Sequence, residues 1–211
     1  MPKPKDVRSI IHWHALKEYT FCAYGIGNFL IFMGYFIPLF YVPYFAIDYL
    51  GTSQELGFGL LAVLNGTSLF GRIGSSLLSP RVGASKLLLG AVVVSSIMLF
   101  GWIGINSLSG FVVFCVLFGF FSGVLISANP IVVAHPVVSP TPSVIGTRLG
   151  MQWFATSLGV LVGAPIAGAL GDTGTRNAFM KLQGFSGAVT LGGAIFLMVP
   201  LMAIWKYDKK R

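Results

Sequence analysis

Long uncharged runs constrain this chain more than any other feature. Asp, Glu, Lys and Arg are absent from residues 19–47, 56–71, 73–80, 87–147, 149–171 and 182–205. A membrane-spanning helix needs about 20 apolar residues, so the run at 87–147 is long enough for two helices. Only 9% of the 211 residues are charged, whereas a soluble domain has roughly 25%, and the mean hydropathy is +0.83. The sequence therefore predicts a polytopic membrane protein.

The interruptions between these runs predict the fold class. Proline, glycine and polar clusters separate helices expected near residues 20–46, 54–79, 84–104, 108–132, 146–170 and 181–205. The runs are continuous rather than alternating, which excludes an outer-membrane barrel. We expect an all-α fold in which residues 1–18 form a cytoplasmic amphipathic lead-in, 19–205 a six-helix transmembrane bundle, and 206–211 a basic cytoplasmic tail.

Lysine and arginine are distributed unequally between the two ends of this bundle. An even number of helices places both termini on the same side of the membrane. The lysines and arginines expected on that side are Lys3, Lys5, Arg8, Lys17, Arg81, Lys86, Arg148, Lys206, Lys209, Lys210 and Arg211. The other side has Arg176 and Lys181. Positive charge favours the cytoplasmic side, so we expect cytoplasmic termini in an integral membrane protein, which we assign to the plasma membrane. The net charge of +8 follows from this bias; it indicates the lipid bilayer as a partner, and no nucleic acid.

No residue pattern indicates a metal, a cofactor or an enzyme. His12 and His14 have no third ligand of suitable type nearby, so an interfacial location is favoured over a metal site. Cys22 and Cys115 fall inside predicted helices and are expected to be reduced thiols. No Asp pair, Ser/Lys dyad or histidine cluster lies in a predicted span, and no filter-like loop indicates a channel.

One predicted helix carries a polar stripe. Asn65, Ser68, Arg72, Ser76 and Ser79 recur every three or four residues and so share one face. Arg72 is the charged residue well inside a predicted span, and an arginine there costs about 2.5–3.5 kcal/mol to insert. We interpret it as part of a ligand or pathway, the alternative being an arginine that snorkels to the headgroups.

The six helices also show a faint three-plus-three symmetry. Pro43 and Pro130 interrupt the first and fourth helices at similar depths. Corresponding proline-interrupted helices are typical of transporter binding sites. The neutral polar residues of these two helices, Asn28, Tyr35, Ser122 and Asn129, are therefore expected to line a water-accessible path.

Two segments resemble major facilitator superfamily transporters, in particular the fungal monocarboxylate-permease-like group. GRIGSSLLSPRVG (71–83) is similar to the end of that family's eighth helix and the following loop, and IGTRLGMQWFATSLGVLVGAPIAGALGDTG (145–174) to its eleventh helix. The resemblance implies that the chain corresponds to the C-terminal six-helix half. It further implies an N-terminal half or a second bundle as partner, and transport of small organic anions.

The resemblance also assigns roles to particular residues. Arg72 matches an arginine implicated in binding the substrate carboxylate, with Asn65 and Ser68 as neutral neighbours. Ser68 replaces an aspartate of related transporters, so it cannot hold a titratable proton. Arg81 and Gly83 match the gating loop, where Pro80 replaces the usual acid. A non-transporting protein, degenerate or truncated, is the alternative.

Overall fold

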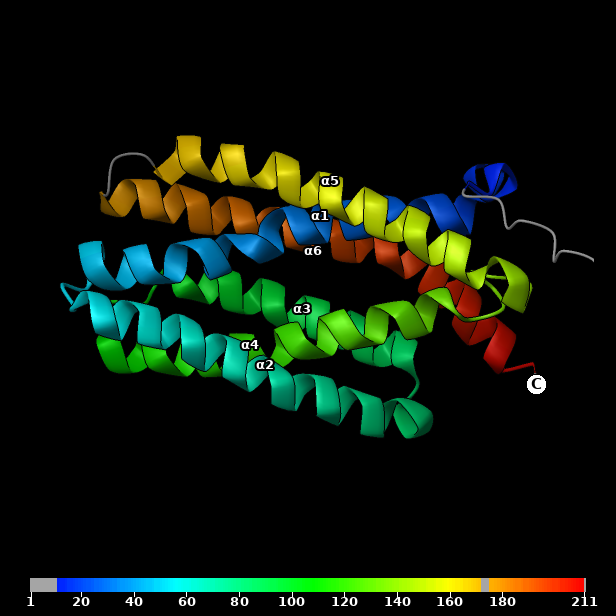
Figure 1. The fold of residues 1–211 in the computed structure, drawn as a ribbon, viewed down its shortest axis with the longest axis horizontal. Coiled ribbons are helices and arrows are strands. Elements are labelled where there is room, and N and C mark those ends of the chain that lie inside the picture. Colours follow the sequence, from blue (N-terminus) through cyan, green and yellow to red (C-terminus); the bar gives the residue numbers. More distant parts are fainter. Residues whose placement is uncertain (1–10, 172–174, 211) are drawn as a thin grey trace, which may run out of the picture.

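The computed structural model describes residues 11–171 and 175–210 and confirms an all-α fold (Figure 1). Six of its helical segments are long and apolar enough to cross a membrane, and no β-strand occurs in the described ranges. The helices are α1 (Tyr19–Tyr44), continued by the π-helical turn η2 (Phe45–Tyr49), α2 (Gln54–Val82), α3 (Ala84–Trp102), α4 (Leu108–Val133), α5 (Ile145–Gly171) and α6 (Arg176–Asp208). Short 3-10 turns, η1 (Trp13–Lys17) and η3 (Pro142–Val144), precede α1 and α5. Lys3, Lys5, Arg8 and Arg211 lie outside the described residues.

Polar caps fix where several helices begin. The side chains of Ser53, Ser107 and Thr175 each accept a hydrogen bond from a backbone N–H in the first turn of α2, α4 and α6. Gly83 ends α2 with a φ of +93°, a conformation that glycine adopts without a steric cost. α6 begins at Arg176, five residues before the predicted start, because Thr175 rather than the uncharged run determines its first turn.

The helix α2 continues through Pro80, where the sequence predicted its end. Proline leaves the carbonyl four residues earlier without its usual N–H donor. Here that carbonyl belongs to Ser76, and the hydroxyl of Ser79 donates to it at 3.4 Å. The side chain thus replaces the missing backbone bond, and the helix runs on to Val82.

The packing of the helices repeats between the two triplets. α1 packs mainly against α5 and α6, α4 packs mainly against α2 and α3, and α3 contacts α6. Each first helix of a triplet therefore packs on the second and third helices of the other triplet. This exchange supports the three-plus-three organisation, with α1 matching α4 and α2 matching α5.

Glycines bring the main helix pairs into backbone contact. A Cβ atom built on Gly123 of α4 would lie 2.0 Å from the Ser68 carbonyl oxygen on α2. On α5, a Cβ at Gly163 would lie 2.3 Å from the Met33 carbonyl oxygen on α1. Only glycine permits this approach, as is typical of close helix packing in membranes. The pairs α2–α4 and α1–α5 are thus built in the same way.

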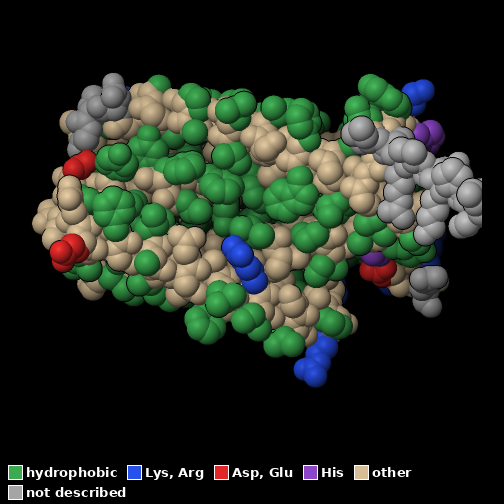
Figure 2. Space-filling view, in the orientation of Figure 1, with side chains coloured by type: hydrophobic (Ala, Val, Ile, Leu, Met, Phe, Trp, Pro, Cys, Tyr) green, Lys and Arg blue, Asp and Glu red, His purple; other side chains and the backbone are tan. Residues whose placement is uncertain are grey.

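The six helices are not equally covered. In the most apolar window of α1 and of α4, 61% and 56% of the residues are buried, against 28% in α2 and 22% in the span containing α5. Figure 2 shows hydrophobic side chains over most of one face, acidic side chains near its ends, and a positive side chain near its middle. The start of α1, the end of α6 and the α2–α3 connection lie at one end of the bundle (Figure 1).

Candidate functional site

Arg72 lies on the outward face of α2. Its side chain is exposed, and no acidic residue within the described ranges forms an ion pair with it. The helix ends ten residues later at Val82, which places Arg72 about 15 Å along the axis from that end. A guanidinium at this depth lies on a largely apolar surface, on which Asn65 and Ser76 are also exposed.

Two further predicted residues lie close to this arginine. Tyr35 of α1 and Ser122 of α4 interact through their side chains, and the Tyr35 hydroxyl lies within electrostatic range of Arg72. Tyr35 is 3% exposed and Ser122 is completely buried. Ser122 also donates to the Gly119 carbonyl at 2.6 Å. Tyr35 and Ser122 thus interact between α1 and α4, within electrostatic range of Arg72 on α2 but buried where Arg72 is exposed.

Asn28 and Asn129 form a second, separate group. The Asn129 amide donates to the Asn28 side-chain oxygen, and the Tyr24 hydroxyl donates to the Asn129 side-chain oxygen at 2.9 Å. Asn28 in turn donates to the Tyr24 carbonyl at 2.9 Å. Both asparagines are buried between α1 and α4. In this conformation they bond to each other and to Tyr24, which the sequence analysis did not single out.

The polar stripe of α2 is divided between two surroundings. Ser68 is buried against α4, whereas Asn65 and Ser76 are exposed beside Arg72. Their side chains donate to carbonyls of the same helix: Asn65 to Leu61 at 2.9 Å, Ser68 to Asn65 at 2.7 Å and Ser76 to Arg72 at 2.9 Å. These polar groups are satisfied locally, so they do not pair with the guanidinium.

The predicted gating residues lie at the end of α2. Arg81 is exposed in the last turn, and Gly83 joins α2 to α3. No ion pair involves Arg81 within the part of the chain that the structure describes. This agrees with the replacement of the usual neighbouring acid by Pro80.

Arg148 has a role that sequence reasoning missed. In the sequence analysis it is counted only among the cations on the side of the termini, but in the first turn of α5 the Arg148 side chain is 0% exposed. Its two terminal nitrogens donate to both carboxylate oxygens of Glu18 at 2.6 Å each, and its Nε donates to His12 at 3.2 Å. The guanidinium also lies 5.3 Å from the centre of the Phe21 ring. The Arg148 hydrogen bonds lower the pKa of Glu18, partly opposed by burial.

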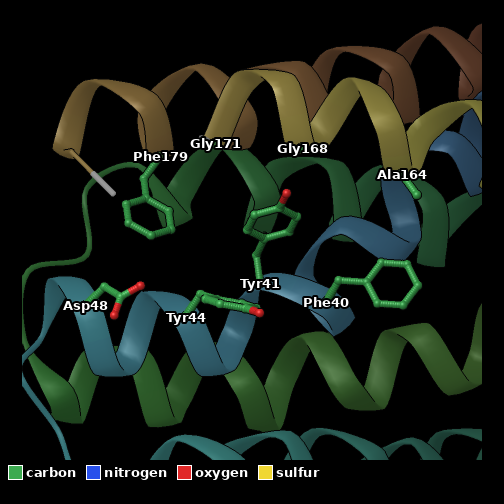
Figure 3. A pocket seen from close by; sticks show the side chains of 8 residues that line it. All are labelled: Phe40, Tyr41, Tyr44, Asp48, Ala164, Gly168, Gly171 and Phe179. Carbon is green, nitrogen blue, oxygen red and sulfur yellow. The ribbon is translucent and has the colours of Figure 1, made fainter. Parts of the chain in front are cut away.

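A hollow of about 520 Å³ opens at the end opposite the termini (Figure 3). Aromatic side chains of α1 and α6 line it together with small residues of α5 and the carboxylate of η2: Phe40, Tyr41, Tyr44, Asp48, Ala164, Gly168, Gly171 and Phe179. The rings can hold a flat apolar group. Asp48 makes this hollow unfavourable for an anion, so it is distinct from the surroundings of Arg72.

Known proteins similar to this chain are fungal transporters. No protein-family model matches the chain. MFS transporter asaE of Aspergillus flavus is 36% identical over 199 residues, which is 93% of this chain and 43% of asaE. The agnestins efflux protein AgnL12 of Paecilomyces divaricatus is 34% identical over 203 residues, covering 96% and 44% of the two chains.

A third relative is the aspyridones efflux protein apdF of Emericella nidulans, 32% identical over 192 residues, or 91% of this chain and 38% of apdF. The chain spans about two fifths of the length of these curated relatives. Their names are those of transporters and efflux proteins, not enzymes, as expected from the sequence. With its six apolar helices the chain is thus an integral membrane protein whose relatives are fungal MFS-type transporters.

Proposed function

We propose that this chain is the C-terminal six-helix half of a fungal major facilitator transporter that moves small organic anions, monocarboxylates among them. Similarity to transporters over more than nine tenths of the chain is the observation that carries the proposal. Two of these relatives are named as efflux proteins. Outward movement across the plasma membrane is therefore the direction we propose.

The surroundings of Arg72 favour an anion. A guanidinium remains charged and presents two parallel donors that match a carboxylate. The Tyr35 hydroxyl, which interacts with Ser122 of α4, lies within electrostatic range of it on α1. No described acid neutralises the guanidinium, so its charge remains available to a ligand. In this role Asn65 and Ser68 are neutral orienting groups, and Asn28 and Asn129 contribute once the path opens.

A second bundle completes the proposed site. The face with exposed Arg72 belongs to α2, one of the two helices with the least burial. Lipid is a poor neighbour for a guanidinium at this depth. An N-terminal six-helix half that covers α2 and α5 would remove this cost and supply the opposite wall, as alternating access requires.

Exchange into asaE tests the role of Arg72. In a chimera in which this chain replaces the matching segment of asaE, Arg72→Ala should abolish carboxylate uptake into proteoliposomes. Arg72→Lys keeps the charge but loses the planar fork, so uptake should fall about tenfold or more. Lys86→Ala, which removes an exposed cation at the loop, is the matched control and should transport at the parent rate. Parent-rate transport by Arg72→Ala would overturn the anion assignment.

Orientation is tested by thiol labelling in intact cells. We propose that both termini and the α2–α3 connection face the cytoplasm. Single cysteines at Gln54, the first residue of α2, and at Lys86, in the first turn of α3, serve as exposed reporters at opposite ends of the bundle in a Cys-free chain. An impermeant reagent should label position 54 only. Labelling of position 86 instead would reverse the proposed orientation.

One observation favours a non-transporting interaction protein as the second candidate. Arg81 has no described acidic partner, and Pro80 stands in place of the acid that would help gate the transporter. The asaE chimera separates the two candidates. A chimera that folds but moves no substrate, and that gains transport on Pro80→Asp, would assign this chain to the non-transporting class.

A further inference from the structure

A second cavity lies at the end of the bundle where α1 starts and α6 ends. It measures about 500 Å³ and opens between the start of α1, the connection from α4 to α5, and the last turns of α6. Its lining consists of Glu18, Tyr19, Thr20, Val137, Ala203, Lys206, Tyr207 and Lys210. None of these residues belongs to the proposed transport site around Arg72.

The cavity lies at the level of the lipid headgroups. Lys206 is the first charged residue after the uncharged run 182–205, so the hydrocarbon-spanning part of α6 ends at the cavity. Tyr19 is 73% exposed and Tyr207 is 37% exposed. Exposed aromatic rings with polar tips are enriched at the membrane–water interface. The cavity therefore faces the polar edge of the bilayer rather than bulk water or the hydrocarbon.

The charge of the cavity is positive because the acid in its lining, Glu18, and the nearby Asp208 of α6 are already paired. Both oxygens of Glu18 accept hydrogen bonds from Arg148, and Asp208 pairs with His135 at 3.1 Å. Lys206 in the last turn of α6 and Lys210, two residues beyond its end, form no ion pair within the described ranges. Two ammonium groups thus border the same opening without a protein counter-ion.

We propose that this cavity binds the phosphate of an anionic phospholipid headgroup. Lys206 and Lys210 contact the phosphate as two point charges, and the hydroxyls of Tyr19 and Thr20 border the same space. The acyl chains then extend along the apolar surface of α6. Basic cavities between helices at this level are suited to such headgroups. The proposal does not depend on transport, since it involves neither Arg72 nor a second bundle.

Lipid retention by the purified chain tests the proposal. Detergent-solubilised protein is incubated with phosphatidylserine or with phosphatidylcholine, and bound lipid is counted by native mass spectrometry. The wild type should retain phosphatidylserine preferentially. Lys206→Gln with Lys210→Gln should weaken retention about 25-fold, from about fivefold for each lysine near a headgroup. Lys206→Arg with Lys210→Arg should retain the lipid, which separates lost charge from lost folding.

A second double variant that removes the same charge elsewhere distinguishes lipid binding in this cavity from a general attraction of anionic lipid to the positive end of the bundle. Lys86→Gln with Lys209→Gln also removes two exposed lysines at the same end, but neither residue lines the cavity. This variant should retain phosphatidylserine as the wild type does. An equal loss in both double variants would overturn the site. Inorganic phosphate is the competing source of the same chemistry, and binding of it as tightly as of phosphatidylserine would overturn the lipid assignment.

Discussion

Two arginines on equivalent helices have opposite surroundings. α2 packs on α4 as α5 packs on α1, and each of these pairs is in backbone contact through glycines. Yet Arg72 on α2 is exposed without an acidic partner, whereas Arg148 on α5 is 0% exposed and holds Glu18 with both terminal nitrogens. The residue type is the same, and the contacts differ completely.

This difference separates a structural arginine from a candidate binding arginine. Each side-chain nitrogen of Arg148 donates to His12, Glu18 or Val138, so this arginine connects the lead-in to α5. Arg72 stabilises no comparable network among the described residues. The charge of Arg72 therefore remains available, and its loss should affect transport rather than folding.

The largest expected effect is the difference in stability between a variant that lacks Arg148 and a variant that lacks Arg72. Arg148→Ala leaves Glu18 partly buried without its partner, which should cost about 3 kcal/mol of unfolding free energy. Arg72→Ala should change stability by less than about 0.5 kcal/mol, or stabilise the chain slightly. Thermal unfolding of the detergent-solubilised chain measures both. Equal losses would show that the exposed arginine is structural as well.

A smaller loss of stability should follow from disturbing the glycine contacts between α2 and α4 and between α5 and α1. Gly123→Ala and Gly163→Ala place a Cβ within 2.0 and 2.3 Å of a facing carbonyl oxygen. Each should destabilise the bundle by about 1–3 kcal/mol through overpacking. Gly66→Ala is the control, since its Cβ would meet nothing within 4 Å. A loss at only one contact would show that the two helix pairs are not equivalent.

The smallest expected effect is a loss of stability at low pH. Because Arg148 lowers the pKa of Glu18, the pair contributes its full stability above the ordinary pKa of a glutamate, 4.5. That contribution is lost as the pH falls through the lower pKa of the folded state. The wild type and Arg72→Ala should therefore lose stability below about pH 4.5, and Glu18→Gln should lose less. If Glu18→Gln and the wild type show the same dependence of stability on pH, the Glu18 carboxylate does not cause the loss of stability in acid.

The helices could be predicted because each depends on residues close together in sequence. Uncharged runs of about 20 residues have to span the membrane wherever they occur. Errors fell at helix ends, where one side chain decided the outcome. Ser79 allowed α2 to pass Pro80, and Thr175 advanced the start of α6.

The candidate site could be predicted only in part. Periodicity along one helix placed Arg72, Asn65 and Ser68 on α2, but it could not show which of them another helix covers. The partner of Arg148 is 130 residues away in sequence, and no local pattern identifies it. The aromatic hollow around Phe40 and Tyr44 likewise arises from helices α1, α5 and α6 coming together.

The hydrogen bonds between α1 and α4 have a consequence for synthesis. Asn28 and Asn129 are 101 residues apart, and Tyr24 also depends on Asn129. At about 5–20 residues per second, α1 waits roughly 5–20 s after its own translation before α4 exists. During that interval the polar side chains of α1 have no α4 partner in the bilayer. An insertion chaperone that shields Tyr24 and Asn28 during this interval would therefore protect α1 from pairing wrongly.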